Sequence, residues 1–307
     1  MLKHETAGDP MTGLKWTRKT TEKIAEELAT HGVKVSANTV GRILKNLKFL
    51  LRVNHKKLSS GSKADQDERN EQFIYISKLK EQFAHAGHPI ISVDTKKKEL
   101  VGNFKNAGVA WNKEPVLVKD HDFRSEAKGM AAPYSLYDVL ANRGFVCVGM
   151  SSDTAEFAVD SIEKWWSSEG RHLYPNADKL LILADGGGSN GVKNKAWKFN
   201  LQKQLCDRHK IDVTVCHYPT GASKWNPVEH RLLSEISKNW AGRPLDNYET
   251  VVNYIRTTRT TTGLEVNACL VEKTYETGIK VPDKEMAALS LHRHNTQPKR
   301  NYTLHPR

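Results

Sequence analysis

The chain contains 307 residues, of which 38% are hydrophobic and 27% are charged, and its formal net charge is +12 at pH 7. This composition favours one large folded core with a small satellite domain and argues against a disordered or fibrous chain. No segment approaches the about 20 consecutive apolar residues that a membrane-spanning helix needs. Residues 1–10 have no apolar run typical of a signal peptide, and the four cysteines form no Cys-x-x-Cys pair. We therefore expect a cytoplasmic protein.

The positive charge is concentrated at the two ends of the chain. Residues 1–64 contain 13 Lys and Arg against 5 Asp and Glu, and residues 292–307 contain 4 against none, whereas residues 65–291 balance at 30 against 30. Clustered cations release counterions from a phosphate backbone when they bind it, so this distribution favours nucleic acid as the partner. Solvated basic ends with no partner are the structural alternative.

Two short helices are expected near the N-terminus. Helical spacing of Ile24 and Leu28 predicts a first helix from Thr20 that stops at Gly32. Ser36 is expected to cap a second helix. The apolar residues that recur at helical spacing in this second helix are Val40, Ile43, Leu44 and Leu47. Two helices joined by a tight turn form the helix-turn-helix pattern, although an ordinary helical hairpin looks the same.

In a DNA-binding motif of this kind, the first residues of the second helix face base edges and later lysines contact phosphates. The residues expected at bases are Ser36, Asn38, Thr39 and Arg42, and those expected at phosphates are Lys45 and Lys48. We predict a helix-turn-helix domain over residues 1–60 and a polar linker with a connecting helix over residues 61–88.

From residue 89 onward, apolar strands alternate with helices. Strands are expected at residues 90–93, 143–152, 180–184 and 211–219, and helices at residues 152–170, 192–210 and 223–242. The first of these helices is expected to be capped near Asp153, with its tryptophans in the core. The alternation predicts an α/β domain over residues 89–307 that ends in a basic C-terminal tail.

Three carboxylates stand where these elements begin or end. Asp94 and Asp185 each follow an apolar strand, and Glu229 lies one turn into a helix, 44 residues after Asp185. Phosphoryl transfer with two metal ions needs a cluster of hard oxygen ligands, because Mg²⁺ prefers carboxylates and keeps water and phosphate in its other positions. We therefore predict a catalytic site in which these three acids hold two Mg²⁺ ions, for which Mn²⁺ can substitute.

Each acid also has a purely structural interpretation. Asn226, Pro227 and Glu229 together are typical of a helix start, with Asn226 as the N-cap, Pro227 at the first position and Glu229 at the third. Asp185 can open an Asx-turn, and Asp94 can simply end a strand. The joint occurrence of the three acids in a chain with a basic helical domain favours the metal site.

The glycines of residues 186–191 also fit the pattern GxGxxG of a dinucleotide-binding fingerprint. However, the strand that follows ends on Cys216 and His217, where that fingerprint requires an acid for the ribose. We instead expect these glycines to let a DNA backbone approach Asp185 closely.

Long segments of the chain occur in the order known from one family. They include SVDTKKKELVGNFKNAG, PYSLYDVLANRGFVCVG, LLILADGGGSNG and VCHYPTGASKWNPVEHRLLSEISKNWAGRPL. These segments resemble the DDE transposases of bacterial insertion sequences, specifically the Rhodopirellula-type DDE domain group, and the likeness covers residues 10–305.

The resemblance implies a ribonuclease H-like fold, a mixed sheet flanked by helices, and Mg²⁺-dependent DNA strand cleavage and strand transfer. Its catalytic triad falls on Asp94 in SVDTK, Asp185 in ADGGGSN and Glu229 in WNPVEHR. Four basic residues beside these acids are expected to position phosphates, with surface solvation as the alternative. They are Lys96, Lys97, His230 and Arg231.

The expected partner is double-stranded DNA, both the element ends and the target, bound by a homodimer in a synaptic complex. The expected location is the bacterial cytoplasm, with the nucleoid, and no membrane is involved. The alternative function is that of a non-enzymatic DNA-binding protein, a truncated or degenerate transposase that keeps end recognition.

Overall fold

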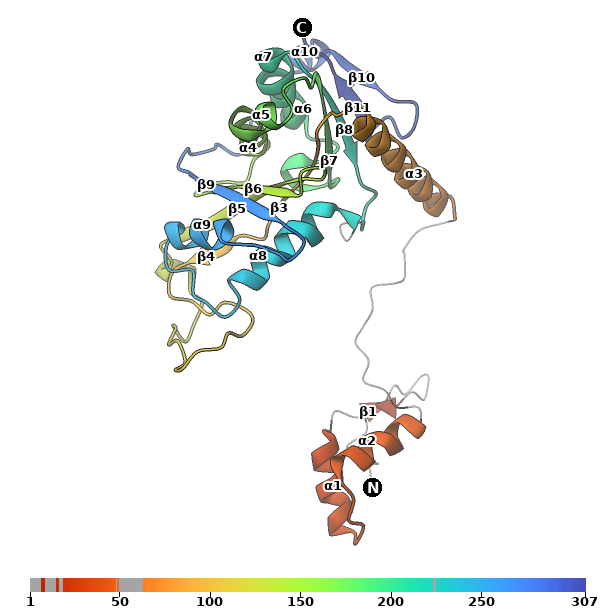
Figure 1. Ribbon diagram of the computed structural model, residues 1–307, viewed down its shortest axis with the longest axis vertical. Coiled ribbons are helices and arrows are strands. Elements are labelled where there is room, and N and C mark those ends of the chain that lie inside the picture. Colours follow the sequence, from red (N-terminus) through yellow and green to blue (C-terminus); the bar gives the residue numbers. More distant parts are fainter. Residues whose placement is uncertain (1–6, 9–14, 17–18, 48, 50–62, 223–224) are drawn as a thin grey trace. The chain divides into compact units, whose positions relative to one another are not determined.

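The computed structural model describes residues 7–8, 15–16, 19–47, 49, 63–222 and 225–307 (Figure 1). Contacts within the chain divide it into two compact units, Met1–Ser60 and Gly61–Arg307. None of the helices in the described ranges combines the length and the apolar character needed to cross a membrane.

The first unit contains two capped helices, α1 (Thr21–Thr30) and α2 (Ala37–Asn46), and a short antiparallel pair, β1 (Ala7–Gly8) and β2 (Lys15–Trp16). Both expected helices are confirmed. The side chain of Ser36 accepts a hydrogen bond from the N–H of Thr39 at 3.2 Å, so the expected cap is also confirmed.

The apolar face of α2 differs from the expectation. Val40 is the one buried residue of α2, as Ile24 is of α1, whereas Ile43 and Leu47 are exposed. Two helices of ten residues share only a small contact area, so the later apolar residues of α2 lie outside it. The turn between the helices contains Gly32, whose φ of +82° favours glycine.

The second unit is built on one mixed sheet with the strand order β10-β11-β8-β7-β3-β5-β6-β9, and β4 pairs with β5. The strands are β3 (Ile90–Thr95), β4 (Glu99–Val101), β5 (Gly129–Asp138), β6 (Arg143–Gly149), β7 (Lys179–Ala184), β8 (Asp212–His217), β9 (Glu265–Val271), β10 (Leu291–Arg293) and β11 (Asn301–Leu304). The pairs β3–β7, β7–β8 and β6–β9 are parallel, and the other pairs are antiparallel.

Helices cover both faces of this sheet. They are α3 (Lys63–His85), α4 (Ala155–Trp165), α5 (Arg171–Leu173), α6 (Lys195–Leu201), α7 (Asp207–His209), α8 (Ser234–Asn239), α9 (Tyr248–Arg256) and α10 (Asp283–Ala287). Alternate residues of the central strands pack to opposite sides: Ile91 and Val93 contact the cluster with α4 and α6, and Ile90 contacts the cluster with α3. This architecture is the mixed sheet flanked by helices that the sequence predicted.

The helix cap expected at Asp153 lies one residue later. The side chain of Thr154 accepts the hydrogen bond from the N–H of Phe157 at 3.2 Å and caps α4. Asp153 is directed elsewhere, because its carboxylate accepts a hydrogen bond from the Thr95 hydroxyl at 3.3 Å. The helix stripe expected to be core is buried, including Ile162, Trp165 and Trp166.

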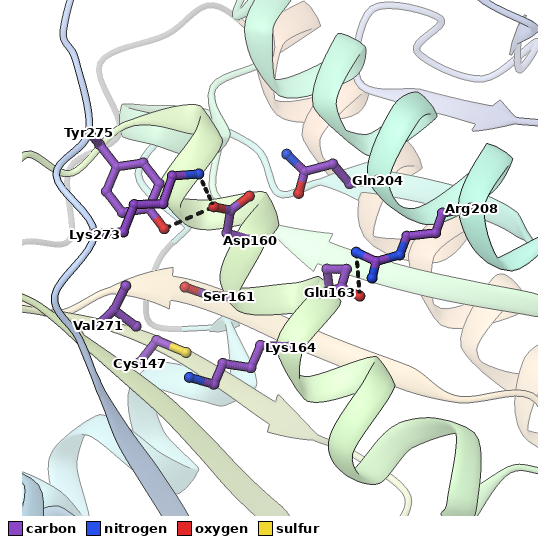
Figure 2. Close-up of a pocket in the computed structure, with 10 residues that line it drawn as sticks. All are labelled: Cys147, Asp160, Ser161, Glu163, Lys164, Gln204, Arg208, Val271, Lys273 and Tyr275. Atoms are coloured by element: carbon purple, nitrogen blue, oxygen red, sulfur yellow. Dashed lines mark hydrogen bonds and ion pairs between the residues drawn. The ribbon is translucent and has the colours of Figure 1, made fainter.

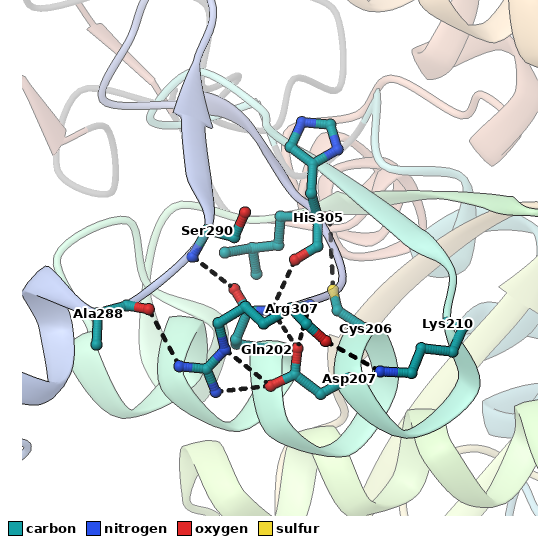
Figure 3. A network of polar contacts seen from close by, with 9 residues as sticks. Gln202, Cys206, Asp207, Lys210, Ala288, Ser290, His305 and Arg307 are labelled. Carbon is teal, nitrogen blue, oxygen red and sulfur yellow. Dashed lines mark hydrogen bonds and ion pairs between the residues drawn. The ribbon is translucent and has the colours of Figure 1, made fainter.

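The C-terminal segment expected to be a basic tail is part of the sheet. Strand β11 pairs with β8, and its Tyr302 and Leu304 are fully buried. The chain end is fixed by polar contacts shown in Figure 3: the Arg307 guanidinium lies 2.6 Å from the Asp207 carboxylate and donates to the Ala288 carbonyl at 3.0 Å. A strand of four residues is too short for its alternation to stand out in the sequence.

Candidate active site

The three predicted acids meet at one edge of the sheet. Strands β3 and β7 are parallel neighbours, so their carboxyl ends bring Asp94 and Asp185 to the same place. Glu229 begins a turn of π-helix, Glu229–Leu233, that continues into α8. The carboxyl groups of Asp94 and Glu229 share a hydrogen bond, and the charges of Asp185 and Glu229 both act on Asp94.

Burial and neighbouring carboxyl groups raise the pKa of Asp94 and of Asp185. Burial, the hydrogen bond with Glu229 and the neighbouring charge of Asp185 raise the pKa of Asp94 to about 8. Burial and the charge of Glu229 also raise the pKa of Asp185, against a hydrogen bond from Asn226 that lowers it. The cluster therefore concentrates more negative charge than the surrounding side chains neutralise.

A buried polar pair holds the helix that carries Glu229. Ser92 on β3 donates a hydrogen bond to the Asn226 side-chain oxygen, and accepts one from the N–H of Val228 at 3.0 Å. The Asn226 amide also lies 3.5 Å from Asp185 Oδ1. Asn226 thus faces the acids, and Ser92 provides the cap that the sequence assigned to Asn226.

Two of the acids, Asp94 and Asp185, line a cavity of about 350 Å³. Its lining residues are Asp94, Thr95, Lys96, Lys97, Lys98, Asp153, Asp185, Gly187, Gly188, Ser189 and Asn190. Asp153 adds a fourth carboxylate, half-buried and hydrogen-bonded to Thr95 and Ser189, and burial raises its pKa. In the sequence Asp153 is predicted only as the start of a helix, and no local pattern indicates that it belongs to the cavity.

The glycine loop after Asp185 is held by buried side chains. Tyr134 donates a hydrogen bond to the Asn190 side chain at 2.8 Å, and the Lys198 ammonium donates to the Val192 carbonyl. Gly188 adopts a φ of +65°, and a side chain at Gly187 would point into open space. The loop is therefore held at its C-terminal end and presents bare backbone beside Asp185.

The basic residues expected near the acids differ in their surroundings. Lys97 is exposed in the cavity wall and is joined there by Lys98, which the sequence analysis missed. Lys96 is mostly buried, with its ammonium 2.6 Å from Glu99 and 4.8 Å from the centre of the Trp240 ring. His230 and Arg231 are exposed on the helix that follows Glu229 and are not part of the cavity lining.

The residues expected to contact DNA in the first unit lie at the start and along the exposed side of α2. Asn38, Arg42 and Lys45 lie on the helix, and all three side chains are exposed. The hydroxyl groups of Ser36 and Thr39 lie 3.0 Å apart and bond each other. Lys48 lies outside the described residues.

The acid cluster offers carboxylate oxygens, which are the donor type of a site for a hard divalent cation. Across the described ranges, no group of three or more His, Cys, Asp or Glu side chains is spaced closely enough to hold a metal ion as the side chains stand. The hydrogen bond between Asp94 and Glu229 requires a proton on one of the two carboxyl groups, which relieves the repulsion between them. Carboxylate oxygens are among the ligands that Mg²⁺ and Mn²⁺ prefer.

The family model of the Rhodopirellula transposase DDE domain matches residues 1–306 of the chain. The chain belongs to this transposase family. The DDE transposase predicted from the sequence is thereby confirmed at the level of the family. A comparison with curated protein sequences finds no significant match.

Among solved structures, the chain is similar to Mos1 transposases. A Mos1 paired-end complex with the left transposon end is 16% identical, with a TM-score of 0.47, and the match covers 77% of this chain and 65% of that one. A Mos1 mariner paired-end complex with Mn is 15% identical, with a TM-score of 0.46, and a Mos1 strand transfer complex is 16% identical, with a TM-score of 0.45. This DDE-family chain thus spans 65% of the length of the first of these transposases.

Proposed function

We propose that this DDE-family chain is the transposase of an insertion sequence, in which Asp94, Asp185 and Glu229 hold two divalent metal ions and catalyse DNA strand cleavage and strand transfer. The observation that carries the proposal is the meeting of the three carboxyl groups, with Asp94 and Glu229 in hydrogen-bond contact. Bound Mg²⁺ or Mn²⁺ would activate a water or 3′ hydroxyl and stabilise the leaving oxygen.

The protein's own residues orient the reacting groups. The scissile phosphate would enter the cavity of about 350 Å³ beside Lys97 and Lys98, whose charges attract a phosphate backbone. The bare backbone at Gly187 leaves room for a strand beside Asp185. Asn226 holds Asp185 through its amide, so the carboxylate keeps one orientation while the phosphate is attacked.

The proposed partners are the two ends of the element and a target duplex. The first unit would read the ends through Asn38 and Arg42 at bases, with Lys45 at phosphates. Two ends must be joined in one complex before transfer, so we propose a homodimer in that complex. The proposed place of action is the bacterial cytoplasm, where the nucleoid lies.

The test uses DNA that carries the sequences flanking the gene in its own element. Asp185→Asn and Glu229→Gln should abolish Mg²⁺-dependent nicking of this DNA and leave its retardation in gels unchanged. Glu235→Gln is the matched control on the same helix, because Glu235 pairs with Lys238 at 2.6 Å and should be dispensable.

Two results would change the conclusion. Equal nicking by Asp185→Asn and the wild type would remove Asp185 from the catalytic site. Retardation without any Mg²⁺- or Mn²⁺-dependent nicking by the wild type would favour the alternative, a non-enzymatic DNA-binding protein.

A further inference from the structure

Two cysteines face each other across neighbouring strands, away from the acid cluster. Cys147 on β6 and Cys269 on β9 are register partners in a parallel pair, and their sulfur atoms are 3.5 Å apart. Cys147 is fully buried, whereas Cys269 is only partly buried. The pair joins the edge strand β9 to its neighbour β6.

This geometry suits a covalent bond between the two sulfur atoms. Paired strands lie about 4.8 Å apart, which is within the Cα separation of about 4.4–6.8 Å found for disulfides. The sulfur atoms need to approach by about 1.5 Å from 3.5 Å to reach bonding distance. Rotation of the two side chains covers this change without a shift of either strand.

The charges around the pair favour a thiolate on Cys269. The two sulfur atoms lie 3.5 Å apart in a hydrogen bond that either of them can donate, and the Lys164 ammonium on α4 also contacts Cys269. These contacts, with the more distant charge of Arg256 on α9, lower the pKa of Cys269 to about 6 against the opposing effect of burial. The pKa of Cys147 is raised, so Cys147 keeps its proton.

The carboxylates near the cysteine pair form ion pairs and hydrogen bonds with side chains other than Lys164. Figure 2 shows Asp160 hydrogen-bonded to Lys273 at 2.8 Å and to Tyr275 at 2.9 Å. Glu163 pairs with Arg208 at 3.1 Å. In the same view, the side chain of Lys164 extends toward the sulfur of Cys147. The positive charge of Lys164 therefore acts on the sulfur pair.

A small molecule can reach Cys147 from a cavity, and Cys269 is itself partly exposed. A cavity of about 300 Å³ is lined by Cys147, Ser161, Lys164 and Tyr275 among others. A water molecule occupies about 30 Å³ in the liquid, so a hydroperoxide of about twice that size fits. Reactive cysteines lie in positively charged, partly exposed surroundings of this kind.

We propose that Cys147 and Cys269 form a peroxide-reactive dithiol site that closes reversibly to a disulfide. The Cys269 thiolate attacks a peroxide oxygen, so that an S–O bond forms, the O–O bond breaks, and the leaving hydroxide takes up a proton to become water. The Cys147 sulfur then attacks the sulfur of the sulfenic acid. The S–S bond forms, the S–O bond breaks, and the Cys147 proton leaves with the hydroxide as a second water.

The electrons lost and gained in these steps are equal. The two thiols lose two electrons in total, and one hydrogen peroxide is reduced to two water molecules. A thiol reductant reverses the bond by exchange. The site is independent of the proposed transposase activity, because neither cysteine borders the acid cavity.

The test starts from the reduced full-length protein, which has four free cysteines. After treatment with hydrogen peroxide, unfolding and alkylation, intact-mass spectrometry should show two alkylatable thiols instead of four and a mass loss of two hydrogen atoms. Dithiothreitol should restore four. Cys269→Ser should give no cross-link, whereas Cys206→Ala, at a buried cysteine that ends the π-helical turn Gln202–Cys206, should still give it.

The wild-type mass decides the matter without any variant. Four alkylatable thiols after peroxide treatment would overturn the proposal, and so would added oxygen on Cys269 with Cys147 still alkylatable. Lys164→Gln should move the pH midpoint of the reaction upward from about 6, because the thiolate loses its ammonium partner. An unchanged pH profile would remove Lys164 from the site.

Discussion

Ser92 and Asn226 connect the strand that carries Asp94 to the helix that carries Glu229. Both side chains are fully buried, and the Ser92 hydroxyl donates to the Asn226 side-chain oxygen while it accepts from the N–H of Val228. The placement of Glu229 against Asp94 therefore depends on a polar pair whose members lie 134 residues apart.

Ser92→Ala should destabilise the protein and impair catalysis together. It leaves the Asn226 oxygen and the Val228 N–H without this partner, and each unsatisfied buried group costs about 1–3 kcal/mol. Thermal unfolding should show a lower Tm, and nicking should fall more than DNA binding because Glu229 loses its support.

Ser135→Ala is the matched control on the neighbouring strand β5. Ser135 is also fully buried, but its hydroxyl has no hydrogen-bond partner within the described ranges. Its removal should leave the Tm unchanged or raise it, since an unsatisfied polar group is lost. Equal losses in the two variants would show that the Ser92 contacts do not support the helix.

Asp94 should make stability fall as the pH rises. Its pKa of about 8 in the folded chain compares with about 3.9 in an unfolded one. Between these values the folded state binds the extra proton, so the free energy of unfolding decreases with pH by up to about 1.4 kcal/mol per unit. Urea unfolding from pH 5 to pH 8 without divalent ions measures this slope. Asp94→Asn should flatten the profile, and parallel profiles would contradict the assignment.

Divalent metal binding should release a proton near neutral pH. A metal ligand must be deprotonated, and Asp94 holds its proton up to about pH 8. Titration of Mg²⁺ or Mn²⁺ by calorimetry in two buffers of different ionisation enthalpy should therefore give different apparent heats. Asp94→Asn should remove this buffer dependence. Identical heats for the wild type would mean that binding does not involve the Asp94 proton.

The sequence predicted the parts of the fold that have strong local patterns. The apolar runs before Asp94 and Asp185 are long enough to identify β3 and β7, and parallel pairing then brings both acids to one edge. Glu229 is identified because its helix follows the next strand of the sheet, β8. The three acids were therefore accessible from periodicity and chain order, and the family resemblance named the same residues.

The supporting residues could not be predicted, because they depend on contacts between distant segments. Ser92 and Lys198 are ordinary members of a strand and a helix in the sequence, and only the folded chain places them at Val228 and Val192. Lys198 is buried with its pKa lowered to about 8, which no local pattern reveals.

Arg42 and Lys45 should affect DNA binding in different ways. Arg42→Ala should cost about 1–3 kcal/mol on the element end and relax sequence preference, because a base contact is lost. Lys45→Ala should weaken binding to all sequences and reduce the salt slope by about one, as expected for a phosphate contact. Gel retardation on end and unrelated DNA at several salt concentrations separates the two. Equal effects on both DNAs would remove Arg42 from base recognition.

Truncation of the C-terminus should show that this segment is structural. Removal of residues 301–307 deletes β11, and with it the fully buried Leu304 and Tyr302, whose hydroxyl accepts a hydrogen bond from Trp197 at 3.0 Å. Each such side chain contributes about 1.5–3 kcal/mol by burial, so this truncation should prevent folding or lower the Tm strongly. Removal of Pro306 and Arg307 alone breaks a half-exposed ion pair with Asp207, worth at most about 1 kcal/mol. Circular dichroism melts compare the two, and equal stability would return the segment to the role of a basic tail.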